Sequence, residues 1–291
     1  MEGILLNSSK TRLWALIAMI ALALGALTAA GCGGGDDNST STAAGGGGST
    51  ANLGLKSEGT LLIGSDIPYP PFEFGDAPNY TGFDVEMVNE IAKRLGVTPK
   101  YQDTAFDTIF TDLAAGQFDM VASASTITPD REKTVDFSDP YYSADQAVVV
   151  LPDTTDIKSI ADLSGKTVAA QSGTTGEAYA KDHTDASDVQ GYPQGPDAIN
   201  ALRAGQVDAT VIDLPVAQDA VEKSGGVQVA FTIPTGELYG MAFQQDNDTL
   251  REAVNKQLEA MKKDGSLDTL YQKYFGVDAP KAVINGTTTP K

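Results

Sequence analysis

Hydrophobic and polar positions form two kinds of pattern between residues 60 and 275. Short apolar runs predict buried strands, and apolar residues that recur every three or four positions predict amphipathic helices. The predicted strands cover residues 61–64, 120–122, 148–151, 167–170, 209–212, 227–231 and 238–243. The predicted helices cover residues 83–95, 106–113, 199–202, 214–222 and 250–261. Strands that alternate with helices predict parallel sheets in an α/β fold.

One block of this pattern occurs twice. Residues 113–119 read Leu-Ala-Ala-Gly-Gln-Phe-Asp, and residues 202–208 read Leu-Arg-Ala-Gly-Gln-Val-Asp. In each copy a helix ends at a glycine, which tolerates a left-handed cap, and a buried strand follows the aspartate. We favour an internal duplication, although the same order is also ordinary in α/β proteins. Ligands of open α/β sheets bind at the carboxyl ends of strands, which predicts a site at residues 123–131 and Asp213.

The duplication predicts two α/β lobes, and the chain can run between them in two ways. The chain either leaves the first lobe near Ala144 and returns near Leu238, or it builds two consecutive lobes with one crossing. Two crossing segments form a hinge. The repeat by itself is compatible with both paths.

Composition narrows the class of protein. The 291 residues are long enough for one large or two small domains, and the formal charge is −19. This charge excludes a general nucleic-acid-binding role, because contacts to phosphates need a positive surface. It suits a secreted soluble protein.

The N-terminal residues have the features of an export signal. Lys10 and Arg12 precede an apolar run at 13–27, and small residues lead to Cys32, which is the only cysteine. The segment resembles a bacterial lipoprotein signal, in which the cysteine becomes the lipidated first residue; an uncleaved anchor is the alternative. We therefore predict a signal peptide at 1–31. A flexible tether at 32–54 and a loose tail at 277–291 follow from their Gly, Ser and Thr content.

Several ordered motifs resemble one protein family. Residues 82–87, Gly-Phe-Asp-Val-Glu-Met, are followed by Ile91, Ala92 and Leu95, and further matches lie at 66–74, 126–131, 135–141 and 171–175. These resemble the bacterial extracellular solute-binding proteins of family 3, the amino-acid receptors of ABC importers. The resemblance runs from about 61 to 275. It implies an α/β, two-lobed periplasmic-binding-protein (Venus flytrap) fold with two hinge crossings. Lobe one then covers 55–145 and 239–276, and lobe two covers 146–238.

The expected ligand is a zwitterion, and Arg131 is the candidate for its carboxylate. Thr128 and Pro129 predict a helix start, which places the Arg131 cation in a first turn where the helix dipole disfavours it unless an anion lies beside it. A guanidinium grips a carboxylate with two parallel hydrogen bonds. The alternative is a surface pair with Asp130 or Glu132. The resemblance implies the carboxylate-binding role.

A second helix start belongs to the same expected subsite. Thr174 and Glu177 form a capping-box pattern, and backbone N–H groups at a helix start bind anions. The resemblance implies that Thr174 or Thr175 donates a backbone hydrogen bond to the ligand's carboxylate.

The α-ammonium of the ligand is expected to meet Asp213. The sequence alone is equally compatible with Asp213 as the N-cap of the next helix, whereas the resemblance implies the ammonium-binding role. Ser123, the Ala124 carbonyl and Thr126 then complete this subsite from lobe one. Local backbone bonding is the alternative for the two hydroxyls.

The side chain of the ligand is expected to lie among Asp66, Tyr69, Phe106 and Gln171. Tyr69 and Phe106 match positions that flank the ligand side chain in the family. The Asp66 carboxylate favours a basic or amide group and repels acidic ligands, and Gln171 offers both a donor and an acceptor. This predicts arginine, lysine or histidine ahead of glutamine. A structural turn role is the alternative for Asp66.

The expected function is that of a binding receptor. It acts as a monomer, is lipid-anchored outside the cell membrane, and delivers one L-amino acid to an ABC permease without a cofactor or metal. An enzyme of the dehydratase type on the same scaffold, with Asp66 or Glu73 as general acid, and a sensory input module are the alternatives. The sequence contains no Gly-x-Ser-x-Gly elbow or phosphate loop. Its only histidine, His183, lies in a polar stretch expected to be a surface loop.

Overall fold

The structure is a computed structural model of the 291-residue chain, and it describes residues 52–285. The predicted signal peptide, the predicted lipidation site at Cys32 and most of the predicted tether lie outside these residues. Among residues 52–285, no helix combines the length and the apolar character that a membrane-spanning helix requires.

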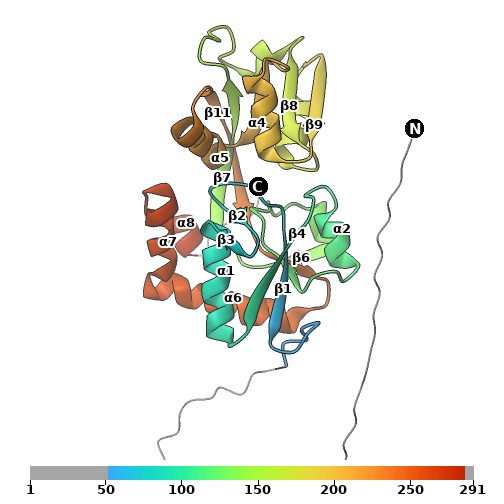
Figure 1. The fold of residues 1–291 in the computed structure, drawn as a ribbon, viewed down its shortest axis with the longest axis vertical. Helices are drawn as coiled ribbons and strands as arrows, with labels where there is room; N and C mark the ends of the chain where they lie inside the picture. The colour runs from blue at the N-terminus through green and yellow to red at the C-terminus, as the bar shows by residue number, and fades with distance from the viewer. Residues whose placement is uncertain (1–51, 286–291) are drawn as a thin grey trace, which may run out of the picture. The chain divides into compact units, whose positions relative to one another are not determined.

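The first lobe is built on a five-stranded sheet with the strand order β4-β1-β5-β12-β6 (Figure 1). Its strands are β1 (Thr60–Ser65), β4 (Thr98–Asp103), β5 (Met120–Val121), β6 (Val135–Phe137) and β12 (Ala242–Gln244), and a separate hairpin joins β2 (Phe74–Asp76) and β3 (Asn79–Thr81). Its helices are α1 (Phe83–Leu95), α2 (Ile109–Ala114), the single turn η1 (Arg131–Lys133), α6 (Asp248–Asp264), α7 (Ser266–Phe275) and α8 (Lys281–Ile284).

The second lobe has a five-stranded sheet with the order β11-β7-β10-β8-β9. Its strands are β7 (Tyr142–Val150), β8 (Thr167–Gln171), β9 (Asp188–Tyr192), β10 (Ala209–Asp213) and β11 (Gln228–Tyr239). Its helices are η2 (Ile160–Leu163), α3 (Thr175–His183), α4 (Gly195–Arg203), α5 (Leu214–Asp219) and η3 (Ala220–Ser224).

Two antiparallel strands connect the lobes (Figure 1). The chain enters the second lobe along β7 and returns along β11, with Tyr142 opposite Tyr239 at one end and Val150 opposite Gln228 at the other. This confirms the predicted two-lobed fold with two hinge crossings. The alternative of two consecutive lobes with one crossing is wrong.

The sheets are mixed rather than parallel, which corrects the prediction. β1 runs parallel to β4 and β5, but the returning chain pairs antiparallel, as β11 with β7 and β12 with β5 and β6. The predicted strands 227–231 and 238–243 are also differently divided, because β11 continues from 228 to 239. A register shift between Ile233 and Glu237 accommodates Pro234, since a bulge tolerates a residue without a backbone donor.

The repeated block forms the same local structure in both lobes. A glycine with positive φ lies two residues beyond the end of each helix, and the aspartate that follows it precedes a buried strand. The Asp119 carboxylate accepts the Leu62 N–H at 2.7 Å, and the Asp208 carboxylate accepts the Thr167 N–H at 2.8 Å. Each aspartate therefore fixes its strand, β5 or β10, against the neighbouring parallel strand. Both strands lead directly into the predicted site residues.

The apolar stripes bury the faces that the periodicity predicts. On α1, Phe83, Met87 and Ile91 are fully buried, and the helix ends at Gly96 with a left-handed φ of 73°. Burial of such side chains contributes about 1.5–3 kcal/mol each. This packing holds α1 against α6 and α7 of the same lobe.

The predicted loose tail is wrong for residues 277–285. α8 packs on the first lobe, where Val283 is fully buried and Ala279 nearly so. The Ala279 N–H also donates to Asp268 at 2.7 Å. The tail contains few apolar residues among many polar ones, so its composition did not indicate a helix.

His183 also lies in a helix rather than in the predicted loop. It is the last residue of α3 and is exposed, with its ring 4.6 Å from that of Tyr179 between centroids. The polar side chains that suggested a loop occupy the solvent-facing end of this helix.

Candidate functional site

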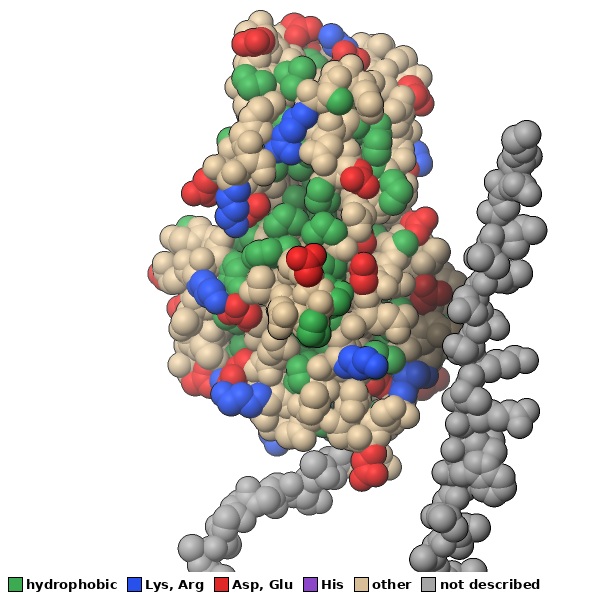
Figure 2. Space-filling view, viewed as in Figure 1, with side chains coloured by type: hydrophobic (Ala, Val, Ile, Leu, Met, Phe, Trp, Pro, Cys, Tyr) green, Lys and Arg blue, Asp and Glu red, His purple; other side chains and the backbone are tan. Residues whose placement is uncertain are grey.

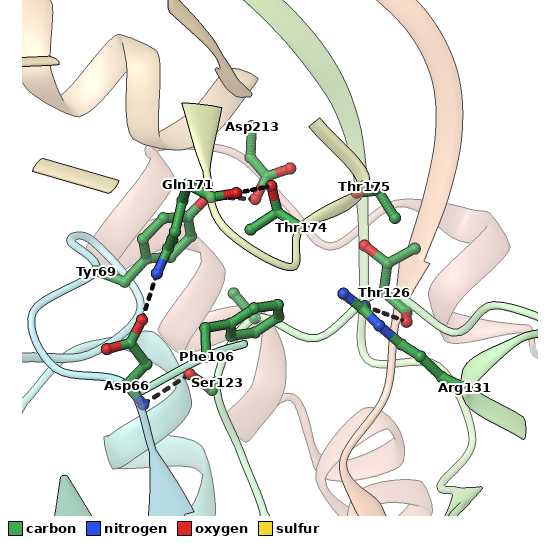
Figure 3. Close-up of a pocket in the computed structure, with 11 residues that line it drawn as sticks. Asp66, Tyr69, Phe106, Ser123, Thr126, Arg131, Gln171, Thr174, Thr175 and Asp213 are labelled. Atoms are coloured by element: carbon green, nitrogen blue, oxygen red, sulfur yellow. Dashed lines mark hydrogen bonds between the residues drawn. The ribbon is translucent and has the colours of Figure 1, made fainter. Parts of the chain in front are cut away.

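All eleven predicted site residues line one cleft between the lobes (Figure 3). They are Asp66, Tyr69, Phe106, Ser123, Ala124, Thr126 and Arg131 from the first lobe, and Gln171, Thr174, Thr175 and Asp213 from the second. The lobes lie close together at this cleft, and only about 10 Å³ of free space remains among the lining side chains. Asp66 and Arg131 lie at opposite ends, with the Phe106 ring between them.

Arg131 begins a helix that is shorter than predicted. η1 is a single 3-10 turn, and the Thr128 hydroxyl accepts the Arg131 N–H at 3.2 Å. The predicted conflict between the Arg131 cation and a helix dipole is therefore small, because one turn carries little dipole. The alternative pairing with Asp130 is wrong, since Asp130 pairs with Lys133 at 2.6 Å.

The guanidinium of Arg131 is held by two backbone carbonyls. Nη1 donates to the Thr126 carbonyl at 2.7 Å, and Nη2 donates to the Gly173 carbonyl at 3.1 Å, across the cleft. A guanidinium has five donors, so three remain for a carboxylate. Arg131 is therefore both fixed in orientation and available for an anion.

Two phenylalanine rings flank this cation. The Arg131 guanidinium carbon lies 5.2 Å from the Phe106 ring centre and 4.6 Å from that of Phe110, which is the distance of cation–π contact. Burial lowers the pKa of Arg131 to about 10, while the nearby Glu237 and Asp213 carboxylates oppose this shift. The guanidinium therefore remains charged at neutral pH.

The start of α3 supplies further donors beside Arg131. The Thr174 hydroxyl accepts the Glu177 N–H at 3.1 Å, which confirms the predicted cap. The Thr174 N–H itself donates to the Gln171 carbonyl at 3.4 Å. First-turn N–H groups have no partner within the helix, so Thr175 is the better donor of the two predicted candidates.

Asp213 is the last residue of β10 and also the N-cap residue of α5, so both interpretations of its position hold. Its side chain makes no capping hydrogen bond and lines the cleft instead. It accepts the Tyr69 hydroxyl at 2.5 Å, from the other lobe, and the Gln146 amide. Burial, and after it the Glu237 carboxylate, raise the pKa of Asp213 to about 7 against the opposing effect of its hydrogen bonds. A cation placed here would relieve this cost of burial.

Ser123 and Ala124 are tied to two buried carboxylates. The Ser123 hydroxyl accepts the Asp66 N–H at 3.0 Å and donates to Glu73 at 2.8 Å, and the Ala124 N–H donates to Asp84 at 2.8 Å. Burial raises the pKa of Glu73 well above its ordinary value, and Asp84 raises it further. Ala124 has a φ of 41°, which is unusual for a residue with a side chain. These bonds fix the turn whose carbonyl and hydroxyl face the cleft.

Asp66 and Gln171 meet at the other end of the cleft. The Gln171 amide donates to the Asp66 carboxylate and to the Pro193 carbonyl at 3.1 Å, which uses both of its protons (Figure 3). The Asp66 side chain faces the cleft, so it is not the turn residue of the alternative interpretation. Burial raises its pKa to about 7, and the Gln171 hydrogen bond opposes the rise.

Further acidic residues surround this end of the cleft. Asp103, Asp107 and Asp197 raise the pKa of Asp66 by charge repulsion. Figure 2 shows acidic side chains close to the junction of the two lobes. The electrostatics of this end therefore favour a positively charged group.

Two polar residues of the hinge strands bond residues that line the cleft and were not predicted. Gln146 on β7 bonds Asp213, and Glu237 on β11 accepts the Thr126 hydroxyl at 2.6 Å. Gln146 precedes the apolar run at 147–150, which is a weak signal in the sequence, whereas Glu237 lies in a polar stretch that gives none. Their approach to the site depends on the antiparallel pairing of β7 and β11.

The sequence and the structure both match known proteins. The profile of the bacterial extracellular solute-binding proteins, family 3, matches residues 61–277. The L-cystine-binding protein TcyJ of Escherichia coli (strain K12) is 37% identical over 234 residues, which is 78% of this chain and 86% of that protein. The L-cystine-binding protein TcyA of Bacillus subtilis (strain 168) is 36% identical and covers 94% of this chain and 100% of its own.

Solved structures agree with these relatives. An ancestral arginine-binding protein bound to arginine matches with a TM-score of 0.71 and 41% identity, over 75% of this chain and 99% of its own. The ancestral amino acid-binding protein AncCDT-1, a precursor of cyclohexadienyl dehydratase, matches with a TM-score of 0.70 and 40% identity, over 75% and 96% of the two chains. At 41% and 40% identity, these structures resemble the chain in sequence as well as in fold.

Proposed function

This chain belongs to the bacterial extracellular solute-binding proteins of family 3, and on that premise we propose that it binds one L-amino acid in the interlobe cleft. The observation that carries the proposal is the pair of complementary charges around one small space. Arg131, with the N–H groups at the start of α3, faces the position of an α-carboxylate. Asp213 faces the position of an α-ammonium. A zwitterion satisfies both at once.

Three groups of the first lobe complete the ammonium subsite in this proposal. They are the Ser123 hydroxyl, the Ala124 carbonyl and the Thr126 hydroxyl, which line the cleft beside Asp213. The Arg131–Gly173 and Tyr69–Asp213 hydrogen bonds already connect the lobes. Closure of the lobes around a ligand then follows from hinge motion at β7 and β11.

We propose a cationic ligand side chain, in the order arginine, lysine or histidine ahead of glutamine. Within residues 52–285, the Asp66 carboxylate accepts one side-chain hydrogen bond, from Gln171, and three further aspartates add negative potential at this end of the cleft. Phe106 supplies an apolar surface for the aliphatic part of the side chain. An acidic amino acid would be repelled.

L-cystine is the second candidate, because the relatives TcyJ and TcyA are both named L-cystine-binding proteins. Its distal half also has an ammonium group that suits Asp66. Its distal carboxylate, however, meets Asp103, Asp107 and Asp197. This repulsion is our reason for placing arginine first.

Isothermal titration calorimetry of residues 52–291 against the twenty amino acids and cystine tests the proposal. We expect a dissociation constant far below 1 mM for at least one of them, with arginine the tightest. Absence of any binding at millimolar concentration contradicts the proposed function. Cystine as the tightest ligand contradicts only the proposed order.

The selectivity for a cationic side chain is expected to depend on Asp66. In Asp66→Asn, the affinity for arginine falls by about 10- to 100-fold, because hydrogen bonds to charged groups are worth about 1.5–3 kcal/mol. The affinity for glutamine changes little, so the ratio of the two is the measured quantity. Asp182→Asn, at an exposed position on α3, is the control. An unchanged ratio would remove Asp66 from the side-chain subsite.

The dehydratase alternative is less well supported than binding. AncCDT-1 is named both an amino acid-binding protein and a precursor of an enzyme, so the similarity fits either function. Asp66 and Glu73 are the two candidate general acids. Asp66 lines the cleft but accepts the Gln171 amide, whereas Glu73 is fully buried beneath Ser123 and does not line the cleft. A general acid has to reach the reacting atom. Turnover of prephenate by the purified protein would reverse our preference.

We further propose that the mature chain starts at a lipidated Cys32 and delivers its ligand to a membrane permease. The small residues before Cys32 and the Gly/Ser-rich stretch after it support this proposal. Mass spectrometry of the native N-terminus would detect the acyl chains. An intact N-terminus at Met1 would contradict it.

A further inference from the structure

Glu237 connects both lobes from the hinge. It lies near the end of β11, and its Oε2 accepts the Thr126 hydroxyl of the first lobe at 2.6 Å and the Thr175 hydroxyl of the second lobe at 2.7 Å. Its Oε1 accepts the Gln146 amide at 3.1 Å. One carboxylate therefore holds three donors that come from two lobes and the other hinge strand.

These bonds fix where the hydroxyl protons point. A hydroxyl has one proton and two lone pairs, and an ionised carboxylate only accepts. Because Thr126 and Thr175 give their protons to Glu237, each oxygen presents only lone pairs in other directions. Thr126 lines the cleft, so it is an acceptor there, which suits an ammonium group.

The Gln146 amide is oriented by the same carboxylate. Its Nε2 donates to Glu237 and also to Asp213, whose other oxygen accepts Tyr69. Two acidic acceptors on one side fix the amide with its nitrogen towards the cleft. The chain of bonds therefore runs from Thr126 through Glu237 and Gln146 to Asp213.

We propose that Glu237 is a positioning residue of the amino-acid site: it holds the protons of Thr126 and Thr175 away from the cleft, so that the site accepts hydrogen bonds from the ligand's α-ammonium. This inference rests on the proposed function. Glu237 acts through the two threonines and Gln146.

Glu237→Gln is the decisive variant. The amide keeps the size of the side chain but has one acceptor oxygen and one donor nitrogen, so it cannot accept from both threonines and from the Gln146 amide at once. Either a threonine hydroxyl or the Gln146 amide has to reverse. A Thr126 proton that points into the cleft, or a Gln146 oxygen turned towards Asp213, would disturb the ammonium subsite, and we expect the affinity for L-arginine to fall about 10- to 100-fold.

Asp145→Asn is the matched control. Asp145 lies on the other hinge strand and accepts the Gly236 N–H at 2.9 Å, next to Glu237 but outside the cleft lining. The asparagine oxygen preserves this bond while the same single charge is lost. We expect less than a twofold change in affinity.

A double-mutant cycle separates positioning from a merely structural role. In a Thr126→Val, Thr175→Val background, Glu237→Gln is expected to lower the affinity by a clearly smaller factor than in the wild-type background, because the two hydroxyls are absent and only the contact with Gln146 remains. Affinity is measured by calorimetry with L-arginine, or with L-cystine if arginine does not bind. Thermal unfolding of each variant shows whether it is folded.

Two results would overturn the inference while leaving the proposed function intact. They are a Glu237→Gln protein with wild-type affinity, and an undiminished loss in the double-valine background. If Glu237→Gln does not fold, Thr126→Val serves instead, since it removes the same acceptor and is expected to lose a similar factor. A wild-type chain that binds neither probe nor any other amino acid contradicts the proposed function instead.

Discussion

Arg131→Ala is expected to lower the affinity for every amino acid that the protein binds by about 30-fold to several thousand-fold. Loss of one partner of a buried, hydrogen-bonded charge pair costs about 2–5 kcal/mol. The loss is independent of the ligand's side chain, because Arg131 lies at the end of the cleft opposite Asp66. Calorimetry with at least three different amino acids measures it.

Arg131→Lys distinguishes charge from geometry. Lysine keeps the positive charge, but it lacks the planar fork that meets a carboxylate while bonding the Thr126 and Gly173 carbonyls. We expect an affinity between those of the wild type and the alanine variant. Lys133→Ala removes an exposed cation two residues away and is expected to have no effect. Equal affinity of Arg131→Ala and wild type would mean that the carboxylate binds elsewhere.

Asp213→Asn is expected to weaken binding to a similar extent and, unlike Arg131→Ala, to stabilise the unliganded protein. The asparagine oxygen accepts from Gln146 and its amide donates to the Tyr69 oxygen, so the packing is retained. The ligand's ammonium, however, loses its counter-ion. The free energy of unfolding at pH 8 is expected to rise by about 1–2 kcal/mol, or roughly 2–8 °C in melting temperature.

The pH dependence of the free energy of unfolding tests whether the buried charge of Asp213 causes this stabilisation. The pKa of Asp213 rises from its ordinary 3.8 to about 7 on folding, so the folded state favours the protonated form. The stability that this group contributes is full below about pH 4 and is lost as the pH rises to about 7. The stabilisation by Asp213→Asn should therefore be present at pH 8 and absent at pH 4. Equal stability gains at both pH values would contradict the assignment of burial as the cause.

The local structure of the site could be predicted from single segments of the sequence. Thr174 and Glu177 are three residues apart, and the capping bond between them depends on little else. The strand after Asp208 and the strand after Asp119 follow from short apolar runs, and the structure has both. These features are local, because their hydrogen bonds and their burial period lie within a few residues.

Features that depend on distant partners were missed or only partly predicted. The edge strands β4 and β9 have half-exposed, polar sequences with no clear apolar run, and they are defined by pairing to β1 and β8. α8 is stabilised by its contact with the first lobe rather than by its composition. The position of Gln171 beside Asp66 was expected from the family resemblance, but their hydrogen bond joins residues 105 positions apart.

The sequence by itself determined the buried strands and the amphipathic helices that have a clear apolar pattern, and the charged and polar groups that stand at the ends of buried strands. These depend on backbone propensity and on the periodicity of burial. Only the tertiary structure decided that Glu237 and Tyr69 connect the two halves of the cleft, and that Asp66 and Asp213 have strongly raised pKa values. The reason is physical: desolvation and hydrogen bonding between distant segments depend on the distances that the fold creates, and these distances are not properties of any single segment.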